Sequence, residues 1–444
     1  MTIAPDSQQT TVHGGLPSGP RWPALLQTIA FLRYRHRFIP AMHRKYGDNF
    51  TLSILPGPRE VVVFRKANEI KEIFAGDPAD FHAGEGNAIL GPVMGPHSVL
   101  LTDESVHMRA RKLLMPAFNG ASLRGYKSLV ETIAKTEADQ WRDGQTVVAL
   151  DRMNAVTLEI ILQVVFGVTD PARLDSMRPK VNRMVNISTG LLLGWAYPKV
   201  FSFGPWRRYF QNQADFDAIL YDEIAARRAS TDLDERDDVL SRLLRVGRDE
   251  SDGQEPLSDA ELRDQLVTLL LAGHETTASA LAWTLHELGM NPDVQREAHR
   301  AADEGDDAFL EACLKEGMRV HPIIDQVARK LKRPRTVAGW QIPAQATVAP
   351  SISLAHSSEE NFTEAERYRP RRFLEETIAP NTWIPFGGGV RRCIGAGFAL
   401  MEGTAVLREI MSRFEVTVDG PEGTRLRNIT TVPDGKAPVR LRAR

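Results

Sequence analysis

The sequence feature that most constrains this chain is a glycine-rich loop that ends in a cysteine and runs into an apolar helical pattern. The loop covers residues 386–395 and reads FGGGVRRCIG. Apolar residues then recur at near-helical spacing as far as Phe414, which places Cys393 close to the N-terminus of a predicted helix. The unpaired N–H groups and the positive dipole end of such a terminus favour a thiolate over a thiol. The pattern therefore predicts a sulfur that is suited to binding a metal ion.

The residues around the cysteine suit a flat ligand that carries carboxylates. Gly389 and Gly395 lack a Cβ, so the backbone can pass close to a planar molecule. Arg391 and Arg392 precede Cys393, and guanidinium groups bind carboxylates well. Together these features describe a haem-thiolate pocket.

Two simpler interpretations of the loop are open on the residues alone. A single cysteine near glycines is most often a small buried hydrophobic residue. The glycines could also cradle a phosphate in a dinucleotide-binding turn, but that turn follows an apolar strand within a βαβ unit. Here residues 380–385 precede the loop and contain two prolines, which disfavours a strand.

The longer pattern Phe-Gly-x-Gly-x-Arg-x-Cys-x-Gly resembles the haem-binding signature of the cytochrome P450 family, and the chain matches it at every fixed position. The resemblance implies a fold that is mainly α with a minor β region and forms a single large domain. We expect that domain over residues 21–444, after a disordered N-terminal tail at residues 1–20. The resemblance also implies haem b as the cofactor and Cys393 as the ligand of its iron.

Periodicity and turn residues predict the order of elements along the chain. We expect mostly helices between residues 122 and 300, an irregular segment at 77–102, and an apolar, aromatic stretch at 190–203. The other predicted elements are helices at 22–46, 67–75 and 104–114, strands at 50–54, 60–64, 336–337, 341–342 and 346–349, and a hairpin from residue 425.

A second constrained stretch is the predicted helix from Leu266 to Leu285, which contains the run AGHETT at residues 272–277. The upstream part of this helix is apolar nearly all round, so the helix should be buried. A glycine, a glutamate and two threonines conflict with a buried helix, and such conflicts are typical of functional sites.

The run AGHETT has two other interpretations. It could be a helix bend in which a threonine hydroxyl bonds back to an earlier carbonyl. A zinc site is disfavoured because no second histidine follows at the HExxH spacing. The family resemblance instead implies an oxygen-binding groove in which Gly273 widens the helix turn. In that groove Glu275 and Thr276 would be the catalytic acid–alcohol pair that delivers protons.

A third motif is the pair Glu316 and Arg319, three residues apart on a predicted helix. Most such pairs are solvated and contribute less than about 1 kcal/mol. The resemblance, however, identifies them with the family's Glu-x-x-Arg motif and Arg372 with its later partner. It implies a buried charge network that holds the cysteine loop, and Cys313, one turn earlier, should be a packed small residue.

Four further residues are expected to bind the two propionates of haem. His107 and Arg111 are four residues apart and therefore share one face of a predicted helix. Alone, each of these side chains would more often be a surface charge. The resemblance places them, together with Arg329 and Arg391, where the family binds propionates, and bidentate arginines suit carboxylates.

Charge and cysteine content limit the classes of partner and compartment. A net charge of −2 over 444 residues argues against a nucleic-acid binder. Two cysteines give no disulfide framework, which favours a reducing compartment. The N-terminus lacks the apolar core of a signal peptide, and no apolar run approaches the roughly 20 residues that span a bilayer. We expect a cytoplasmic protein without a membrane anchor.

The resemblance implies a monooxygenase that inserts one oxygen atom from O2 into a lipophilic small molecule, such as a terpenoid, steroid or fatty acid. Electrons should come from a separate ferredoxin or flavodoxin with its reductase, docked on a basic face that includes Arg109, Lys112 and Arg392. A haem-thiolate isomerase, a peroxygenase and a non-enzymatic haem sensor remain alternatives. The apolar candidates for the pocket wall are Ile89, Leu90, Val93, Leu269, Ala272, Ile324 and Val327.

Overall fold

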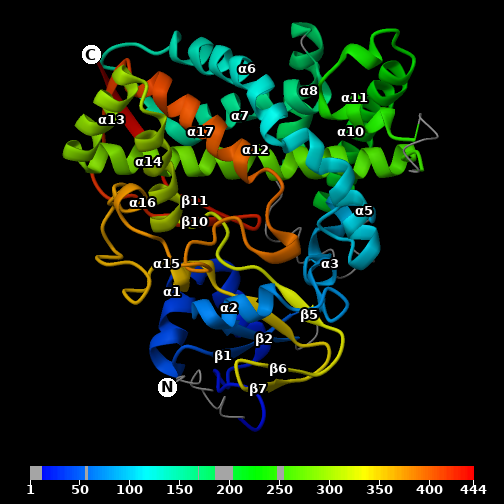
Figure 1. Ribbon diagram of the computed structural model, residues 1–444, viewed down its shortest axis with the longest axis vertical. Helices are drawn as coiled ribbons and strands as arrows, with labels where there is room; N and C mark the ends of the chain where they lie inside the picture. The colour runs from blue at the N-terminus through cyan, green and yellow to red at the C-terminus, as the bar shows by residue number, and fades with distance from the viewer. Residues whose placement is uncertain (1–12, 56–58, 169, 186–203, 248–254) are drawn as a thin grey trace, which may run out of the picture.

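The computed structural model describes residues 13–55, 59–168, 170–185, 204–247 and 255–444. Helices form the larger part of the molecule, and a small mixed sheet lies at one end with α1 and α2 beside it (Figure 1). The expectation of a mainly α fold with a minor β region in a single large domain is confirmed. The apolar stretch predicted at 190–203 lies outside the described residues.

The described helices occur along the whole chain and dominate it before residue 300, as predicted. They are α1 Ala24–Tyr46, α2 Ala67–Phe74, α3 Ala83–Gly86, α4 Gly91–Met94, α5 Glu104–Leu114, α6 Gly120–Ala138, α7 Ala149–Phe166, α8 Pro171–Val185, α10 Gly204–Arg228, α11 Val239–Arg245, α12 Asp259–Met290, α13 Pro292–Glu304, α14 Asp307–Val320, α15 Ile352–His356, α16 Arg372–Glu375 and α17 Ala396–Met411. Short 3-10 turns cover residues 88–90, 115–118, 233–235 and 389–391.

The strands form four small sheets with the orders β1-β2-β8-β5-β3, β4-β12-β9, β10-β11 and β6-β7. They are β1 Phe50–Ile54, β2 Arg59–Phe64, β3 Phe81–His82, β4 Thr146–Val148, β5 Arg329–Leu331, β6 Arg335–Val337, β7 Trp340–Ile342, β8 Thr347–Pro350, β9 Phe414–Thr417, β10 Thr424–Arg427, β11 Thr430–Pro433 and β12 Pro438–Ala443. The predicted early and late hairpins are both present, as β1-β2 and β10-β11.

The largest sheet brings distant parts of the chain together. Strand β2 pairs with β1 in antiparallel register and with β8 in parallel register, so Val61 lies opposite Thr347. Strand β8 also pairs with β5, which begins at Arg329. The sheet thereby fixes the segment before Arg329 against the N-terminal hairpin.

The N-terminal boundary of the folded domain lies earlier than the sequence predicts. Thr51 of β1 donates from its hydroxyl to the Pro17 carbonyl at 2.7 Å and from its N–H to the Ser18 carbonyl at 3.2 Å. A Cβ on Gly19 would lie 1.9 Å from the Thr51 carbonyl oxygen, so the backbones touch there. Residues 13–20 therefore belong to the domain rather than to the predicted tail, because their backbone pairs with β1. Residues 1–12 are outside the described part of the chain.

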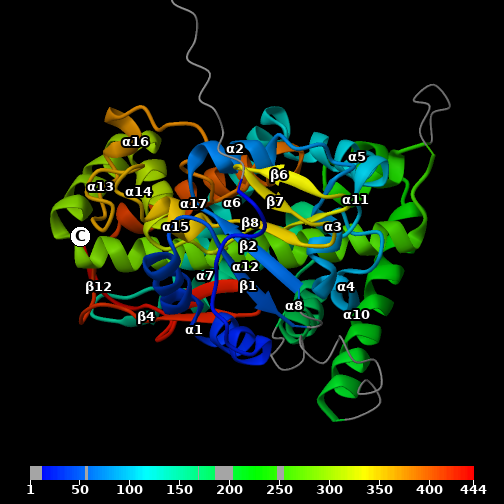
Figure 2. The same ribbon diagram turned by 90° about the horizontal axis from the view of Figure 1, so that it is seen from below.

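Helix α12 is the central element on which the other helices are arranged, and it crosses the whole width of the molecule (Figures 1 and 2). Its first turn is closed by a capping box between Ser258 and Glu261. Most of its residues are buried, as the apolar pattern predicts, including Leu266 and Trp283. Helix α7 runs so close to it that a Cβ on Gly273 would lie 2.8 Å from the Ile161 Cδ1.

Candidate active site

The cysteine loop is a tight turn pressed against the end of α2. The Cys393 N–H donates to the Phe386 carbonyl at 2.9 Å, which closes the loop three residues before α17. Gly389 has a φ of +65°, and a Cβ there would lie 2.2 Å from the Phe74 carbonyl oxygen. The turn and the contact with Phe74 therefore require Gly389, and the close approach to a planar ligand stays a prediction. A Cβ on Gly395 would meet nothing within 4 Å, so open space adjoins the loop beyond the sulfur.

The Cys393 side chain is exposed, although it lies deep enough that burial raises the pKa of its thiol. A backbone hydrogen bond from Gly395 and the charges of Arg111 and Arg392 lower that pKa, but burial is the larger effect. In the protein without a bound ligand, burial therefore outweighs the predicted preference for a thiolate. The exposure of a deep sulfur means that Cys393 faces a space inside the molecule.

The four predicted propionate residues come together near this loop. His107 of α5 is buried, and burial together with the charges of Arg391, Arg111 and Arg329 lowers its pKa to about 4. Its imidazole is therefore neutral at pH 7 and surrounded by three guanidinium groups. The pKa values of Arg111, Arg329 and Arg391 are also lowered, in each case chiefly by burial.

These arginines differ in how their charge is compensated. Arg391 is ion-paired with Asp103 and donates to the carbonyls of Val99 at 3.2 Å and Thr102 at 2.5 Å. Arg329 is buried and donates only to backbone carbonyls, and burial lowers its pKa to about 10. Within the described residues, neither Arg329 nor Arg111 has a carboxylate at ion-pair distance.

Buried, uncompensated guanidinium charge is unfavourable unless an anion is bound beside it. One inward-facing thiol, the buried Arg329 and the partly buried Arg111 match the chemistry of a ligand with one metal atom and two carboxylates. Haem therefore fits the residues that are present here. Arg329, Arg111 and His107 could hold its propionates, whereas Arg391 is already engaged by Asp103.

The run 272–277 lies within an uninterrupted part of α12. The Thr276 hydroxyl donates back to the Ala272 carbonyl at 2.7 Å, as in the simpler interpretation of a back-bonded threonine. Ala272 is exposed and Thr276 partly exposed in the middle of this long helix. A larger residue at position 273 would clash with Ile161, which explains the glycine without a ligand. The predicted widening of the helix turn stays a prediction.

Glu275 is buried and points to the β10-β11 hairpin, not to Thr276. Its Oε1 lies 3.2 Å from the Arg427 Nε and accepts a hydrogen bond from the Thr430 hydroxyl at 3.2 Å. Burial raises the pKa of Glu275, while Arg427 and Thr430 act in the opposite direction. The sequence analysis missed both partners, because nothing in the pattern of the C-terminal hairpin relates it to α12.

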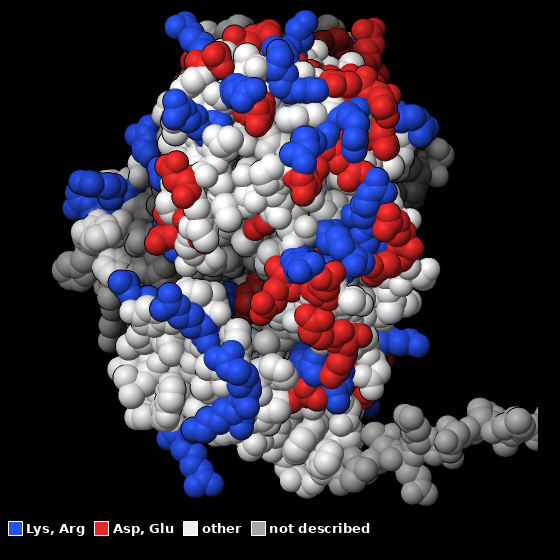
Figure 3. Space-filling model, turned by 90° about the vertical axis from the view of Figure 1, so that its left-hand side faces the viewer, with Lys and Arg blue, Asp and Glu red and all other residues white. Residues whose placement is uncertain are grey.

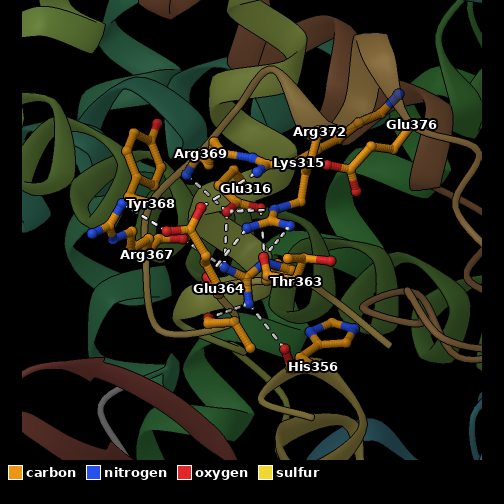
Figure 4. Close-up of polar contacts among 12 residues, drawn as sticks. Lys315, Glu316, His356, Thr363, Glu364, Arg367, Tyr368, Arg369, Arg372 and Glu376 are labelled. Carbon is orange, nitrogen blue, oxygen red and sulfur yellow. Dashed lines mark hydrogen bonds and ion pairs between the residues drawn. The ribbon is translucent and has the colours of Figure 1, made fainter. Parts of the chain in front are cut away.

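The network around Glu316 has the predicted members and is completely buried (Figure 4). The Glu316 carboxylate accepts from the Arg319 Nε at 2.7 Å and Nη2 at 2.8 Å, and from the Arg372 Nε at 3.0 Å. The Arg369 N–H adds a fourth hydrogen bond at 2.9 Å. The expectation of a buried charge network is confirmed, and Cys313 is buried as expected.

The network reaches the cysteine loop through a buried histidine that the sequence analysis did not identify. The Arg319 Nη1 donates to the His356 carbonyl at 2.9 Å, and the His356 Nε2 accepts the Ile384 N–H at 2.9 Å. Ile384 stands two residues before the loop. Burial, followed by the charge of Arg319, lowers the pKa of His356 to about 3, which keeps Nε2 free to accept this bond.

The candidate pocket walls are only partly consistent with their prediction. Val93 is buried in the main hydrophobic core, so its side chain is engaged in the protein interior. The others keep exposed or partly exposed surface, as expected of residues beside a space: Ile89, Leu90, Leu269, Ala272, Ile324 and Val327.

A helical fold with one inward-facing thiol beside guanidinium groups that have no ion-paired carboxylate in the described ranges fits the class of haem-thiolate proteins. The sequence model of the family described as Cytochrome P450 matches residues 16–435. The chain therefore belongs to the cytochrome P450 family, and the expected family and class of monooxygenase are confirmed.

Relatives and solved structures agree with this membership. Cytochrome P450 135A1 of Mycobacterium tuberculosis is 53% identical, over 97% of this chain and 96% of that protein. Cytochrome P450 135B1 of Mycobacterium bovis is 39% identical, over 97% and 92%. The retinoic acid-bound cyanobacterial CYP120A1 has a TM-score of 0.84 at 24% identity, over 97% of this chain and 100% of that one. The haem domain of cytochrome P450DA has a TM-score of 0.82 at 24% identity, over 98% of both chains. Among the described residues, no helix has the length and apolar character needed to cross a bilayer.

Proposed function

We propose that this protein is a haem b monooxygenase that oxidises a lipophilic small molecule in the cytoplasm, with Cys393 as the iron ligand. The observation that carries the proposal is the pairing of an inward-facing Cys393 with Arg329 and Arg111, whose charges have no carboxylate partner in the described part of the chain. The partly exposed apolar residues beside this region favour a lipophilic substrate such as a terpenoid, steroid or fatty acid.

The residues of the chain have separate tasks in this proposal. Bound haem would supply thiolate-assisted cleavage of the O–O bond of O2. Arg329, Arg111 and His107 orient the propionates, and the neutral His107 donates one N–H while adding no further charge. The Thr276 hydroxyl passes protons at its Oγ1, or positions the water that does so. The Glu275 carboxyl, whose pKa is raised by burial, exchanges those protons with the outside through the hairpin side.

A separate electron donor fits the surface on the cysteine side of α5. Lys112 and Arg392 are exposed there, and Val106, Met115 and Val390 expose apolar surface. Arg109 contributes less than the sequence suggested, because it pairs with Glu261 at 2.8 Å. We propose that this surface binds an acidic ferredoxin or flavodoxin, which a reductase keeps reduced.

The ligand assignment is tested by Cys393→Ser against the matched variant Cys313→Ala. Cys393→Ser should abolish the red-shifted Soret band of the ferrous carbon monoxide complex, whereas Cys313→Ala should keep it, because Cys313 is a buried core residue. If Cys393→Ser kept the band, the proposed ligand would be wrong. Turnover that requires both O2 and reductant would separate the monooxygenase from an isomerase, a peroxygenase or a sensor.

A further inference from the structure

The first half of α1 is an amphipathic helix whose apolar side faces solvent. Trp22 just precedes the helix, and Leu25, Leu26 and Ile29 recur at the spacing of a single helical face. All four are about half exposed, and Leu25 reaches 57%. An exposed apolar stripe on a surface helix indicates a partner that covers it.

The opposite side of the same helix is buried, and it carries two polar side chains next to Phe31. The Gln27 side chain donates to the Pro20 and Trp22 carbonyls at 3.1 and 2.8 Å, and accepts the Ser53 N–H at 2.9 Å. The Thr28 hydroxyl accepts the Leu55 N–H at 2.9 Å. These hydrogen bonds fix the rotation of the helix, so the apolar stripe cannot turn inward.

Basic residues accompany the stripe without any acid. Residues 21–46 contain six Lys and Arg and no Asp or Glu, in a chain of net charge −2. Five of the six are exposed: Arg21, Arg33, Arg37, Arg44 and Lys45. In Figure 3 a row of Lys and Arg crosses the lower left of the face, where α1 lies, beside uncharged surface and without Asp or Glu next to it.

These exposed cations differ from basic residues elsewhere on the surface. Arg371 pairs with Glu297 and Glu375, and Arg442 pairs with Glu415 at 3.5 Å. In the described ranges, none of the five exposed cations of α1 and its flank has a carboxylate at ion-pair distance. Unpaired cations next to an apolar stripe are complementary to an anionic surface with an apolar interior.

We propose that the segment from Arg21 to Lys45 is a binding surface for an anionic lipid bilayer. The first half of α1 would lie in the plane of the bilayer, with Leu25, Leu26 and Ile29 among the acyl chains. Tyr34 has non-helical backbone angles, so Arg37, Arg44 and Lys45 belong to the second half of α1, beyond this break, and would contact the headgroups from there. This contact is peripheral and differs from a membrane anchor, because the helix lies on the bilayer and does not cross it. It is independent of the proposed substrate and reaction.

The test measures binding of the haem-loaded full chain to vesicles of phosphatidylcholine, with and without one third phosphatidylglycerol. Wild type should bind the anionic vesicles at least about tenfold more tightly than the neutral ones, and high salt should remove most of this difference. Equal binding to both, or no binding to the anionic vesicles, would overturn the proposal.

Two pairs of variants separate the stripe and its charges from general surface effects. Leu25→Ser/Leu26→Ser should weaken binding about tenfold or more, while Leu374→Ser, at a leucine 47% exposed on α16, should leave it unchanged. Arg33→Gln/Arg37→Gln should weaken binding several-fold, and Arg442→Gln should not. Equal effects in test and control variants would overturn the assignment of this surface.

Tryptophan fluorescence tests whether the segment around Trp22 is the part of the protein that contacts the bilayer. Lipids brominated on the acyl chain should quench part of the tryptophan fluorescence of wild type, and Trp22→Phe should lose that quenched part. Quenching that is unchanged in Trp22→Phe would place the contact elsewhere and overturn the proposal. A dimer in solution that Leu25→Ser/Leu26→Ser dissociates, without vesicle binding by wild type, would identify the stripe as a self-interface and would equally overturn it.

Discussion

Two buried glutamates on neighbouring long helices are held in very different ways. Glu316 of α14 accepts four hydrogen bonds from two guanidinium groups and a backbone N–H, and none of its surface is exposed. Glu275 of α12 has longer contacts, at 3.2 Å, with Arg427 and Thr430, and burial raises the pKa of its carboxyl. The first carboxylate is fixed in one position by these four donors. The second is held less tightly, and the raised pKa of its carboxyl is compatible with a role in proton transfer.

The largest expected effect comes from breaking the Glu316 network. Arg319→Ala leaves the Glu316 carboxylate buried with less of its compensating charge, which should lower the free energy of unfolding by about 3–5 kcal/mol. Arg367→Ala removes an arginine that is 75% exposed in its ion pair with Glu364, and should cost less than about 1 kcal/mol. Urea unfolding and haem content per chain measure both. Full haem retention and wild-type stability in Arg319→Ala would make the network a dispensable contact.

The next effect concerns the connection from this network to the cysteine loop, and it depends on pH. His356 has a folded-state pKa of about 3, against about 6.5 when unfolded, so unfolding takes up a proton between these values. The stability that neutral His356 contributes is present above about pH 6.5 and is lost as pH falls toward 3. Between pH 7 and 4.5 wild type should lose about 2–3 kcal/mol through this residue.

His356→Gln keeps an acceptor for the Ile384 N–H but cannot titrate, so its free energy of unfolding should fall less over the same pH range. His97→Gln, at an exposed histidine, should retain the wild-type slope. The check is urea unfolding at pH 7 and 4.5. Identical slopes for His356→Gln and wild type would show that this histidine is not the residue that takes up the proton.

A smaller effect is expected at the Glu275 pair, because Arg427 is 20% exposed. Arg427→Met should lower the free energy of unfolding by about 1–2 kcal/mol and raise the pKa of Glu275 further. Arg425→Met, two residues earlier, should have a smaller effect, because Arg425 pairs with Asp434 at 3.6 Å and its charge acts on Glu275 less than that of Arg427 does. A double-mutant cycle with Glu275→Gln measures the coupling, and a coupling energy near zero would contradict the ion pair.

Thr276→Ala should have the smallest effect on stability and the clearest effect on the yield of oxidised product. Thr276→Ala removes one back-bonded hydroxyl and should change the free energy of unfolding by less than about 1 kcal/mol. Without that hydroxyl, the ratio of oxidised product to reductant consumed should fall about tenfold or more, with a matching rise in hydrogen peroxide. Ser279→Ala removes a similar hydroxyl, bonded to the Glu275 carbonyl at 2.8 Å, and should keep the wild-type ratio. An unchanged ratio in Thr276→Ala would assign proton delivery to Glu275 or water alone.

Much of this molecule follows from short-range patterns. The span of α5, Glu104–Leu114, and the strand Phe50–Ile54 agree with their predictions, because apolar spacing and turn residues act within a few positions of each other. The network of Glu316, Arg319 and Arg372 was also predictable, but only through the resemblance to a family. The i,i+3 spacing of the first two by itself favours an ordinary surface pair.

The tertiary structure decided which charges meet across long distances in the chain. The family resemblance predicts Arg391 as a propionate ligand, and the fold pairs it with Asp103, 288 residues earlier in the chain, while the propionate contact stays a prediction. Glu275 is predicted to act with its neighbour Thr276, and the fold adds Arg427 as an ion-pair partner that the sequence does not indicate. The glycine at 389 is required by the carbonyl of Phe74, a contact that no local pattern indicates.

The sequence by itself determined the helical architecture, the cysteine loop and the types of side chain available to a haem site. Local propensity, periodicity and motif spacing are properties of neighbouring residues, so they can be read without a structure. Only the tertiary structure decided that Arg329 has no carboxylate at ion-pair distance among the described residues while Arg391 is paired, and that α1 buries Gln27 and exposes Leu25. Those outcomes depend on the tertiary contacts of the chain, because burial and charge compensation arise between segments that are far apart in sequence.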